Sequence, residues 1–411
     1  METIYVVGVG MTPFGRSDGT IKSLSAAALQ AALADAGIVG SNLQAAFFSN
    51  VTQGHMDGQH MIRGQIALRA AGISGIPVVN VENACASAST AFNLAVNYLK
   101  AGEGDVALAL GAEKMVAPDK ALMFSAFDSA WDLATVQENQ ARLATMGAGI
   151  TPPPGSRSER PYSIFMEVYA GFARQHMARF GTTQRQIATV SAKNHLHSVH
   201  NPLSQFRRPF SVDDVLSAPP ITYPLTLPMC SPISDGAAAA VLMTERGLKT
   251  FGIDRTRAIR VLASVVQTGS DRTADEVERH CTVLAARRAY EKAGIGPKDV
   301  SVAEVHDATA MGEIIQTENL GFCAFGEGGA LAERGDTSLG GRIPVNPSGG
   351  LESKGHPIGA TGLGQIYELV QQLRGEAGLR QVEKARIALA ENGGGLVNIE
   401  EAVATITILG R

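Results

Sequence analysis

The 411-residue chain is poor in cysteine, in aromatic side chains, in long apolar runs and in excess charge of either sign. Its four cysteines, Cys85, Cys230, Cys281 and Cys323, are far apart and form no CxxC pair. This spacing excludes a disulfide framework and fits the reducing cytoplasm. No uninterrupted apolar run approaches the roughly 18 residues of a membrane helix, so we expect no membrane contact.

Two further absences limit the function and the location. The formal net charge of −4 leaves no basic excess for binding nucleic acid. Residues 1–15 predict a first strand and lack the basic segment of a signal peptide. We therefore expect a cytoplasmic protein that binds no nucleic acid.

Apolar runs that alternate with amphipathic segments predict an α/β protein. The length suggests two domains or one duplicated domain. The predicted strands are Ile4–Val9, Ala46–Asn50, Val78–Val81, Val106–Leu110, Ala237–Met243, Ile259–Gln267, Val302–Val305, Ile387–Leu389 and Val403–Leu409. The predicted helices are Ile21–Ala36, Ala86–Ala101, Phe165–Phe180, Gln184–Leu196, Ala274–Ala293, Met311–Leu320 and Ala360–Gly375.

A weak internal repeat suggests two similar halves. In each half a strand leads to a turn with a reactive residue, then a helix, a strand and a glycine-containing turn. Between the halves lies a segment enriched in Pro, Arg, Tyr and His, too long for a loop. We predict an N-terminal half over 1–117, an inserted domain over 118–228, the end of the N-terminal half over 229–250, and a C-terminal half over 251–411.

Cys85 is the first candidate for chemistry because it directly precedes a predicted helix of small residues. The positive end of a helix dipole and its unpaired N–H groups lower a thiol pKa and can supply a donor to an oxyanion. The alternative is a buried structural cysteine, since free cysteine is among the most buried residue types.

Two histidines and a glycine run add to this candidate site. His356 stands between Gly355 and Pro357 in a Gly-rich segment, and His306 ends a predicted strand. Open α/β sheets place their sites at such strand ends. The run 393–395 follows another strand and could present N–H groups to an oxyanion. An incidental histidine in a Gly-rich turn is the alternative for His356.

Five segments together resemble the thiolase superfamily, closest to its sterol-carrier-protein-type branch. They are NACAS at 83–87, SDGAAA at 234–239, VHDAT at 305–309, GGLESKGHPIGATG at 349–362 and ENGGG at 391–395. The resemblance implies a thiolase fold, with duplicated βαβαβαββ halves in five α/β/α/β/α layers and an inserted loop domain. It also implies an acyl-CoA substrate with coenzyme A as co-substrate, and no covalently bound cofactor.

The resemblance assigns roles residue by residue. Cys85 corresponds to the nucleophile that is acylated, His356 to its base, and His306 to a residue that holds a thioester oxygen together with His356. The N–H groups of Cys85 and Gly394 correspond to a second oxyanion hole. Ser231 corresponds to a contact with the pantetheine arm.

Arg207 and Arg208 are candidates for binding the CoA phosphates, because guanidinium groups match phosphate geometry. The alternative is that these two arginines are ordinary exposed residues that bind no ligand. His195, His197 and His200 form H-x-H-x-x-H. On a helix the first and last lie about 140° apart, so we predict a solvated helix end and no metal site.

One position departs from the family pattern. Many thiolases carry a second cysteine that moves a proton at the substrate α-carbon, and we place Asn392 at that position. An amide cannot exchange protons near neutral pH. Either His306 or a water takes this role, with Cys230 and Cys323 as further candidates, or the chemistry is not ordinary thiolysis.

Similar sequences without the second cysteine act with a small zinc-ribbon and OB-fold subunit, and the family forms homodimers or larger assemblies. The sequence thus predicts an acyl-CoA C-acyltransferase that cleaves a β-ketoacyl-CoA, or makes one, through an acyl-Cys85 intermediate. A retro-aldol CoA-ester lyase and a non-catalytic acyl-CoA- or lipid-binding subunit are the alternatives. The retained cysteine favours thiolysis, because retro-aldol cleavage needs no acyl-enzyme.

Overall fold

The computed structural model describes residues 2–411, which fold around one nine-stranded mixed sheet. All nine predicted strands are present, several of them longer than predicted. They are β1 (Ile4–Met11), β2 (Ala45–Ser49), β3 (Val78–Val81), β4 (Val106–Glu113), β7 (Gly236–Thr244), β8 (Ile259–Thr268), β9 (Val302–Glu304), β10 (Ile387–Gly394) and β11 (Val403–Gly410).

The strand order shows the predicted duplication. It is β3-β2-β4-β7-β1 in the N-terminal half and β8-β11-β10-β9 in the C-terminal half. The central strands β1 and β8 pair antiparallel, Tyr5 with Arg260 and Val6 with Ile259. From this junction outward both halves repeat the same order, except that the outermost C-terminal strand is reduced to a bridge between Ala303 and Val345.

All seven predicted helices are also present, and the start of one of them is corrected. They are α1 (Ile21–Ala36), α4 (Ser87–Lys100), α7 (Ile164–Phe180), α8 (Gln184–His197), α11 (Cys281–Ala293), α12 (Ala310–Asn319) and α15 (Thr361–Arg374). The helix predicted from Ala274 begins only at Cys281, because the His280 side chain accepts the N–H of Thr282 and caps it.

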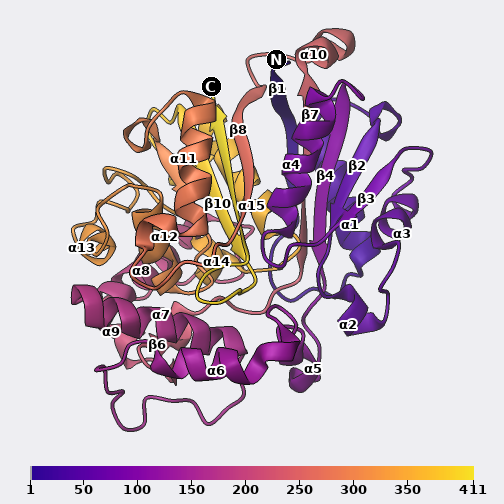
Figure 1. The fold of residues 1–411 in the computed structure, drawn as a ribbon. Coiled ribbons are helices and arrows are strands. Elements are labelled where there is room, and N and C mark those ends of the chain that lie inside the picture. Colours follow the sequence, from indigo (N-terminus) through magenta and orange to yellow (C-terminus); the bar gives the residue numbers. More distant parts are fainter. Residues whose placement is uncertain (1) are drawn as a thin grey trace.

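Figure 1 shows the arrangement of helices and sheet, and the buried apolar clusters show which faces pack together. Helices α4 and α15 lie between the two half-sheets in a shared apolar core that includes Val6, Phe92 and Leu363. Helix α1 and α3 (Arg63–Ala70) cover the outer face of the N-terminal half, and α11 covers that of the C-terminal half. Close approach of α1 requires glycine in β1, since a Cβ at Gly8 would lie 2.3 Å from the Ala32 carbonyl oxygen. This is the expected α/β/α/β/α arrangement.

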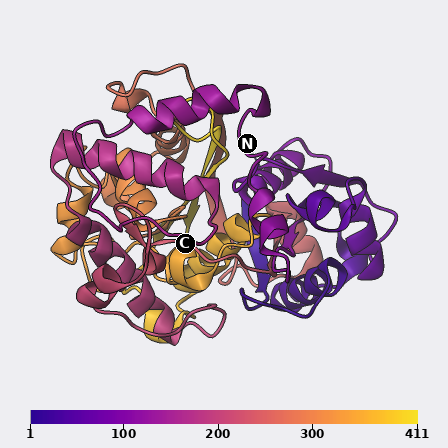
Figure 2. The same cartoon turned by 90° about the horizontal axis from the view of Figure 1, so that it is seen from below.

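The chain between β4 and β7 is mostly helical and lies across one end of the sheet (Figures 1 and 2). Besides α7 and α8 it contains α5 (Lys120–Ser125), α6 (Val136–Thr145), α9 (Val212–Ser217) and a hairpin of β5 (Pro220–Thr222) and β6 (Leu225–Thr226). The remaining helices are α2 (Gln53–Asp57), α10 (Glu245–Phe251), α13 (Gly328–Glu333) and α14 (Gly350–Lys354). Within residues 2–411, none of the helices has the length and apolar character needed to span a membrane.

Candidate active site

A cavity of about 580 Å³ lies between the inserted segment and the strand ends of both halves, and Cys85, His306 and His356 line it. Cys85 precedes α4, His306 follows β9, and His356 lies in the turn between α14 and α15. Three segments that are distant in sequence thus meet at one wall of the cavity, as the sequence motifs predicted.

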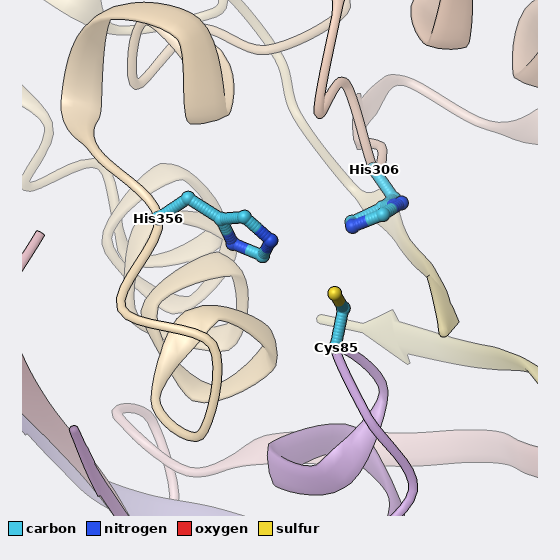
Figure 3. Close-up of side chains that lie close together, drawn as sticks. All are labelled: Cys85, His306 and His356. Atoms are coloured by element: carbon cyan, nitrogen blue, oxygen red, sulfur yellow. The ribbon is translucent and has the colours of Figure 1, made fainter. Parts of the chain in front are cut away.

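The three side chains form a compact group (Figure 3). The Cys85 sulfur and one ring nitrogen of each histidine lie within 4.8 Å of one another. The two imidazole rings meet edge to face, with centroids 5.3 Å apart. In Figure 3 the sulfur points into the space between the rings. A thiol and two imidazoles in this arrangement can exchange a proton and hold a developing negative charge.

Cys85 lies in a strained turn. The preceding residue, Ala84, has a φ of 46°, in the left-handed region that a side chain disfavours. The turn is stabilised by Ser87, whose hydroxyl donates to the Ala84 carbonyl at 2.6 Å and accepts the N–H of Asn83 at 2.8 Å. This turn places Cys85 at the cavity wall.

The electrostatics of Cys85 differ from the sequence expectation. Burial, with smaller contributions from the nearby Glu113 and Glu82, raises the pKa of the thiol to about 12. The N–H groups of Cys85 and Gly395 oppose this shift without cancelling it. The predicted lowering of the Cys85 pKa is therefore wrong for the unliganded protein, because desolvation outweighs the helix terminus.

His356 is fixed through both its backbone and its ring. Its N–H donates to the Ser234 hydroxyl at 2.9 Å, and its Nδ1 lies 2.7 Å from Thr361 Oγ1. Burial and the neighbouring His306 hold the pKa of His356 well below its usual range. The ring is therefore neutral at neutral pH and can accept a proton.

His306 has a free nitrogen in the cavity wall. Its Nδ1 lies 3.4 Å from the hydroxyl of Tyr169, and its backbone N–H donates to Glu391 Oε2 at 2.9 Å. Its buried Nε2 has no hydrogen-bond partner among the described residues. Burial lowers the pKa of His306 to about 4, although Glu401 opposes that shift. An unpartnered buried nitrogen of this kind is suited to a substrate atom.

A buried polar network joins the two histidine-bearing segments. Asp307 accepts the N–H of Leu351 at 2.7 Å, and Asn194 donates to both Asp307 and Glu352. Burial raises the pKa of both Asp307 and Glu352 well above the usual range. The network fixes the position of the His306 segment relative to the segment that carries His356.

The glycine run lies directly on the Cys85 turn. Gly394 packs closely against this turn, because a Cβ there would lie 2.5 Å from the Asn83 carbonyl oxygen and 3.0 Å from the Cys85 nitrogen. The Gly395 N–H acts on the Cys85 thiol and lowers its pKa. The oxyanion role of the Gly394 N–H stays a prediction. Both glycines line the cavity.

Asn392 is fully buried and is not part of the cavity wall. With its amide nitrogen turned toward the Cys85 turn, it donates to the carbonyl oxygens of Cys85 at 2.9 Å and Gly393 at 3.0 Å. Its side chain thus supports the backbone beneath the nucleophile.

The other predicted site residues are divided between the cavity and the rest of the molecule. Ser231 and Cys230 line the cavity. Cys323 packs against the apolar core of the C-terminal half and is excluded as a proton carrier by its position. Arg207 and Arg208 are exposed and lie outside the cavity wall, so their contact with CoA phosphates stays a prediction.

The histidine triplet is not a solvated helix end. His195 and His197 are buried, with 2% and 3% of their surface exposed. His197 Nδ1 donates to the Asn346 carbonyl at 3.0 Å, and its Nε2 accepts the N–H of Leu339 at 3.1 Å. These contacts hold the inserted segment against the C-terminal half, and the three histidines form no metal-binding group in the described structure.

Four functional candidates escaped the sequence reasoning. Thr361 belongs to the GHPIGATG segment and could have been noticed there. Glu391 adjoins the predicted Asn392. Tyr169 and Glu401 line the cavity but carry no local signal, since only the tertiary fold brings them to the two histidines.

Comparisons with known proteins agree with this geometry. The family description "Thiolase, N-terminal domain" matches residues 4–216, and "Thiolase C-terminal domain-like" matches residues 263–411. Sterol carrier protein 2 of Bos taurus is 38% identical over 400 residues, which cover 95% of this chain and 70% of the bovine protein.

Two microbial relatives match over almost their whole length. The acetyl-CoA acetyltransferase of Methanothermobacter thermautotrophicus is 38% identical, covering 96% of this chain and 97% of that protein. The benzoylsuccinyl-CoA thiolase subunit BbsB of Thauera aromatica is 35% identical, and the match covers 95% of this chain and 94% of that protein. A solved structure, the Ltp2-ChsH2(DUF35) aldolase, shares the fold with a TM-score of 0.77 at 22% identity, covering 99% of this chain and 97% of its own. The chain thus belongs to the thiolase family and is an acyltransferase.

Proposed function

We propose that the protein cleaves a β-ketoacyl-CoA with coenzyme A, or catalyses the reverse Claisen condensation, through an acyl-Cys85 intermediate. The observation that carries this proposal is the cluster of the Cys85 sulfur with one nitrogen of each of His306 and His356, within 4.8 Å, at the wall of a large cavity. Thiolase relatives of the same length support the reaction type.

In the first step the neutral His356 accepts the proton of Cys85, and the sulfur attacks the ketone carbon. A thiol with a pKa near 12 requires a base in contact, so attack and proton transfer occur together. The oxyanion that forms on the ketone oxygen is stabilised by the N–H groups of Cys85 and Gly394.

Collapse of this adduct breaks the bond between the α- and β-carbons and leaves the acyl group on Cys85. The electron pair moves to the departing acyl-CoA as an enolate, whose thioester oxygen lies against the unpartnered Nε2 of His306. The enolate carbon then receives a proton from the histidine pair. Coenzyme A thiol finally attacks acyl-Cys85, releases the second acyl-CoA and restores the Cys85 thiol.

The test is acid quenching during turnover of a β-ketoacyl-CoA, followed by mass spectrometry of the peptide that contains Cys85. We expect the acyl mass on Cys85 in the wild type and none in Cys85→Ala, which should also lose turnover. Cleavage of a β-hydroxyacyl-CoA by Cys85→Ala to an aldehyde or ketone and an acyl-CoA, without an acyl adduct, would support a retro-aldol lyase. Binding of acyl-CoA without cleavage would support a non-catalytic subunit.

The assembly is part of the proposal. We infer a homodimer or larger assembly and a small partner subunit with a zinc ribbon and an OB-fold. The edge strand β3 has no neighbour on one side within residues 2–411 and exposes Val79, which suits pairing with another chain. A relative named as a subunit and a neighbour named with a DUF35 component support the partner. Light scattering and thiolysis assays with and without such a subunit test both points.

A further inference from the structure

The cavity wall carries negatively charged side chains and, among the described lining residues, no lysine or arginine. Three carboxylates line it, those of Glu82, Asp132 and Glu401. Glu82 and Asp132 are exposed and screened by water, whereas Glu401 is buried with 6% of its surface exposed. Glu401 is therefore the charge that a bound acyl group meets with the least screening.

Glu401 is held as an anion by its surroundings. Its Oε1 accepts the side-chain N–H of Gln316 at 3.0 Å, and its Oε2 lies 3.2 Å from His280 Nε2. His280 Nδ1 accepts the N–H of Thr282, so the ring proton is on Nε2, the nitrogen that lies near Glu401 Oε2. Burial raises the pKa of Glu401, but His280, with smaller contributions from the Glu401 backbone N–H and His306, lowers it to about 2.

The position of Glu401 depends on a glycine of the catalytic segment. A Cβ at Gly393 would lie 2.7 Å from Glu401 Cγ, so only glycine leaves room for this side chain. The carboxylate shares the cavity wall with His306 and influences the charge of that ring. An anionic group is thus built into the cavity next to the reacting centre.

The rest of the wall is suited to apolar groups with rings. The inserted segment contributes six aromatic side chains to it, Phe124, Phe127, Trp131, Tyr162, Phe165 and Tyr169. Trp131 is the only tryptophan of a chain in which aromatic residues make up 5%. Aromatic walls bury large apolar ligands and pack against their rings.

We propose that the cavity accepts acyl groups that are bulky, apolar and uncharged, and that Glu401 is the specificity-determining residue that rejects acyl chains ending in a carboxylate. This inference rests on the proposed function, because it concerns the acyl group that reaches Cys85. Like charges brought together in a poorly solvated site disfavour binding strongly, and such repulsion is a common means of discrimination.

The test measures binding in Cys85→Ala, where no chemistry follows. The probes are succinyl-CoA, its uncharged near-isostere 4-methylpentanoyl-CoA, and 3-phenylpropanoyl-CoA, studied by calorimetry. All three share the charges of the CoA moiety, so differences report the acyl group. We expect succinyl-CoA to bind at least about 10-fold more weakly than the other two. If succinyl-CoA binds as tightly as the two uncharged acyl-CoAs, or more tightly, this experiment alone overturns the proposal.

Adding Glu401→Gln to the Cys85→Ala variant tests whether Glu401 causes the weaker binding of succinyl-CoA. We expect the ratio of the succinyl-CoA Kd to the 4-methylpentanoyl-CoA Kd to fall by about 10-fold. The control is Glu278→Gln, the same chemical change at an exposed side chain near His280, which should leave the ratio unchanged. An unchanged ratio in a folded Glu401→Gln protein refutes the role of Glu401.

Thiolysis of the matching β-ketoacyl-CoAs by the wild type separates this inference from the proposed function. The substrates are 3-oxoadipyl-CoA, 6-methyl-3-oxoheptanoyl-CoA and 3-oxo-5-phenylpentanoyl-CoA. Absence of thiolysis, with the expected order of binding, contradicts the proposed function and supports the selectivity of the cavity. Thiolysis with 3-oxoadipyl-CoA as the best substrate contradicts the selectivity and supports the proposed function.

Discussion

The Nδ1 atom of His356 lies 2.7 Å from the hydroxyl oxygen of Thr361, and that hydroxyl donates to the Pro357 carbonyl at 3.0 Å. Because the Thr361 hydroxyl donates its proton to the Pro357 carbonyl, it acts toward His356 as an acceptor. The hydrogen bond between them is therefore donated by Nδ1–H of His356. The lone pair of His356 is therefore on Nε2, the atom available to accept a proton in the cavity. Thr361 sets the tautomer of the base.

Replacement of Thr361 tests this relationship. Thr361→Val keeps the shape but removes the acceptor, and we expect kcat to fall by about 10- to 100-fold, as in the loss of a general base. Thr361→Ser keeps the hydroxyl and should retain most of the activity. The measurement is thiolysis at saturating substrate. Equal rates for the Val and Ser variants would show that the hydroxyl does not act on His356.

The raised pKa of Cys85 predicts its reactivity in the unliganded protein. With a pKa of about 12, the thiolate fraction rises tenfold for each pH unit through the neutral range. We expect the rate of alkylation by iodoacetamide at Cys85 to rise from pH 6 to pH 10 without a plateau. Peptide mapping after timed quenching measures this rate. A plateau near pH 7 would show that the helix terminus dominates after all.

Asn392 should be needed for the geometry of the Cys85 turn and not for proton transfer. Asn392→Ala leaves the Cys85 carbonyl without a donor, and we expect a loss of about 1–3 kcal/mol in the free energy of unfolding together with lower turnover. Asn392→Cys should not speed deuterium exchange into acetyl-CoA, because residue 392 does not reach the cavity. NMR of the exchange, with urea unfolding in parallel, measures both. Faster exchange in Asn392→Cys would contradict this placement.

Acid should destabilise the fold through His306. Burial lowers its pKa from 6.5 to about 4, so between these values the unfolded chain binds a proton that the folded chain does not. The stabilisation is complete above pH 6.5 and is lost as the pH falls toward 4, by about 3 kcal/mol for this residue. Urea unfolding at pH 7 and pH 4 measures the change. Between pH 7 and pH 4, the free energy of unfolding of His306→Gln should fall by about 3 kcal/mol less than that of the wild type. An equal fall in both proteins would contradict the lowered pKa of His306.

The sequence by itself determined the strands, most of the helices and the three segments that carry Cys85, His306 and His356. Apolar runs and amphipathic periodicity are local properties, so they survive without knowledge of the fold. The motifs were equally local, since each reactive residue stands at a strand end or helix start within a few residues of glycine or proline.

Only the tertiary structure decided the electrostatics and the shape of the site. The pKa of Cys85 depends on burial and on Glu113, and the charge of Glu401 depends on His280, more than one hundred residues away. His195 and His197 proved to be buried. Desolvation and Coulomb interactions sum over neighbours in space, and those neighbours are distant in the chain, so no local pattern encodes them.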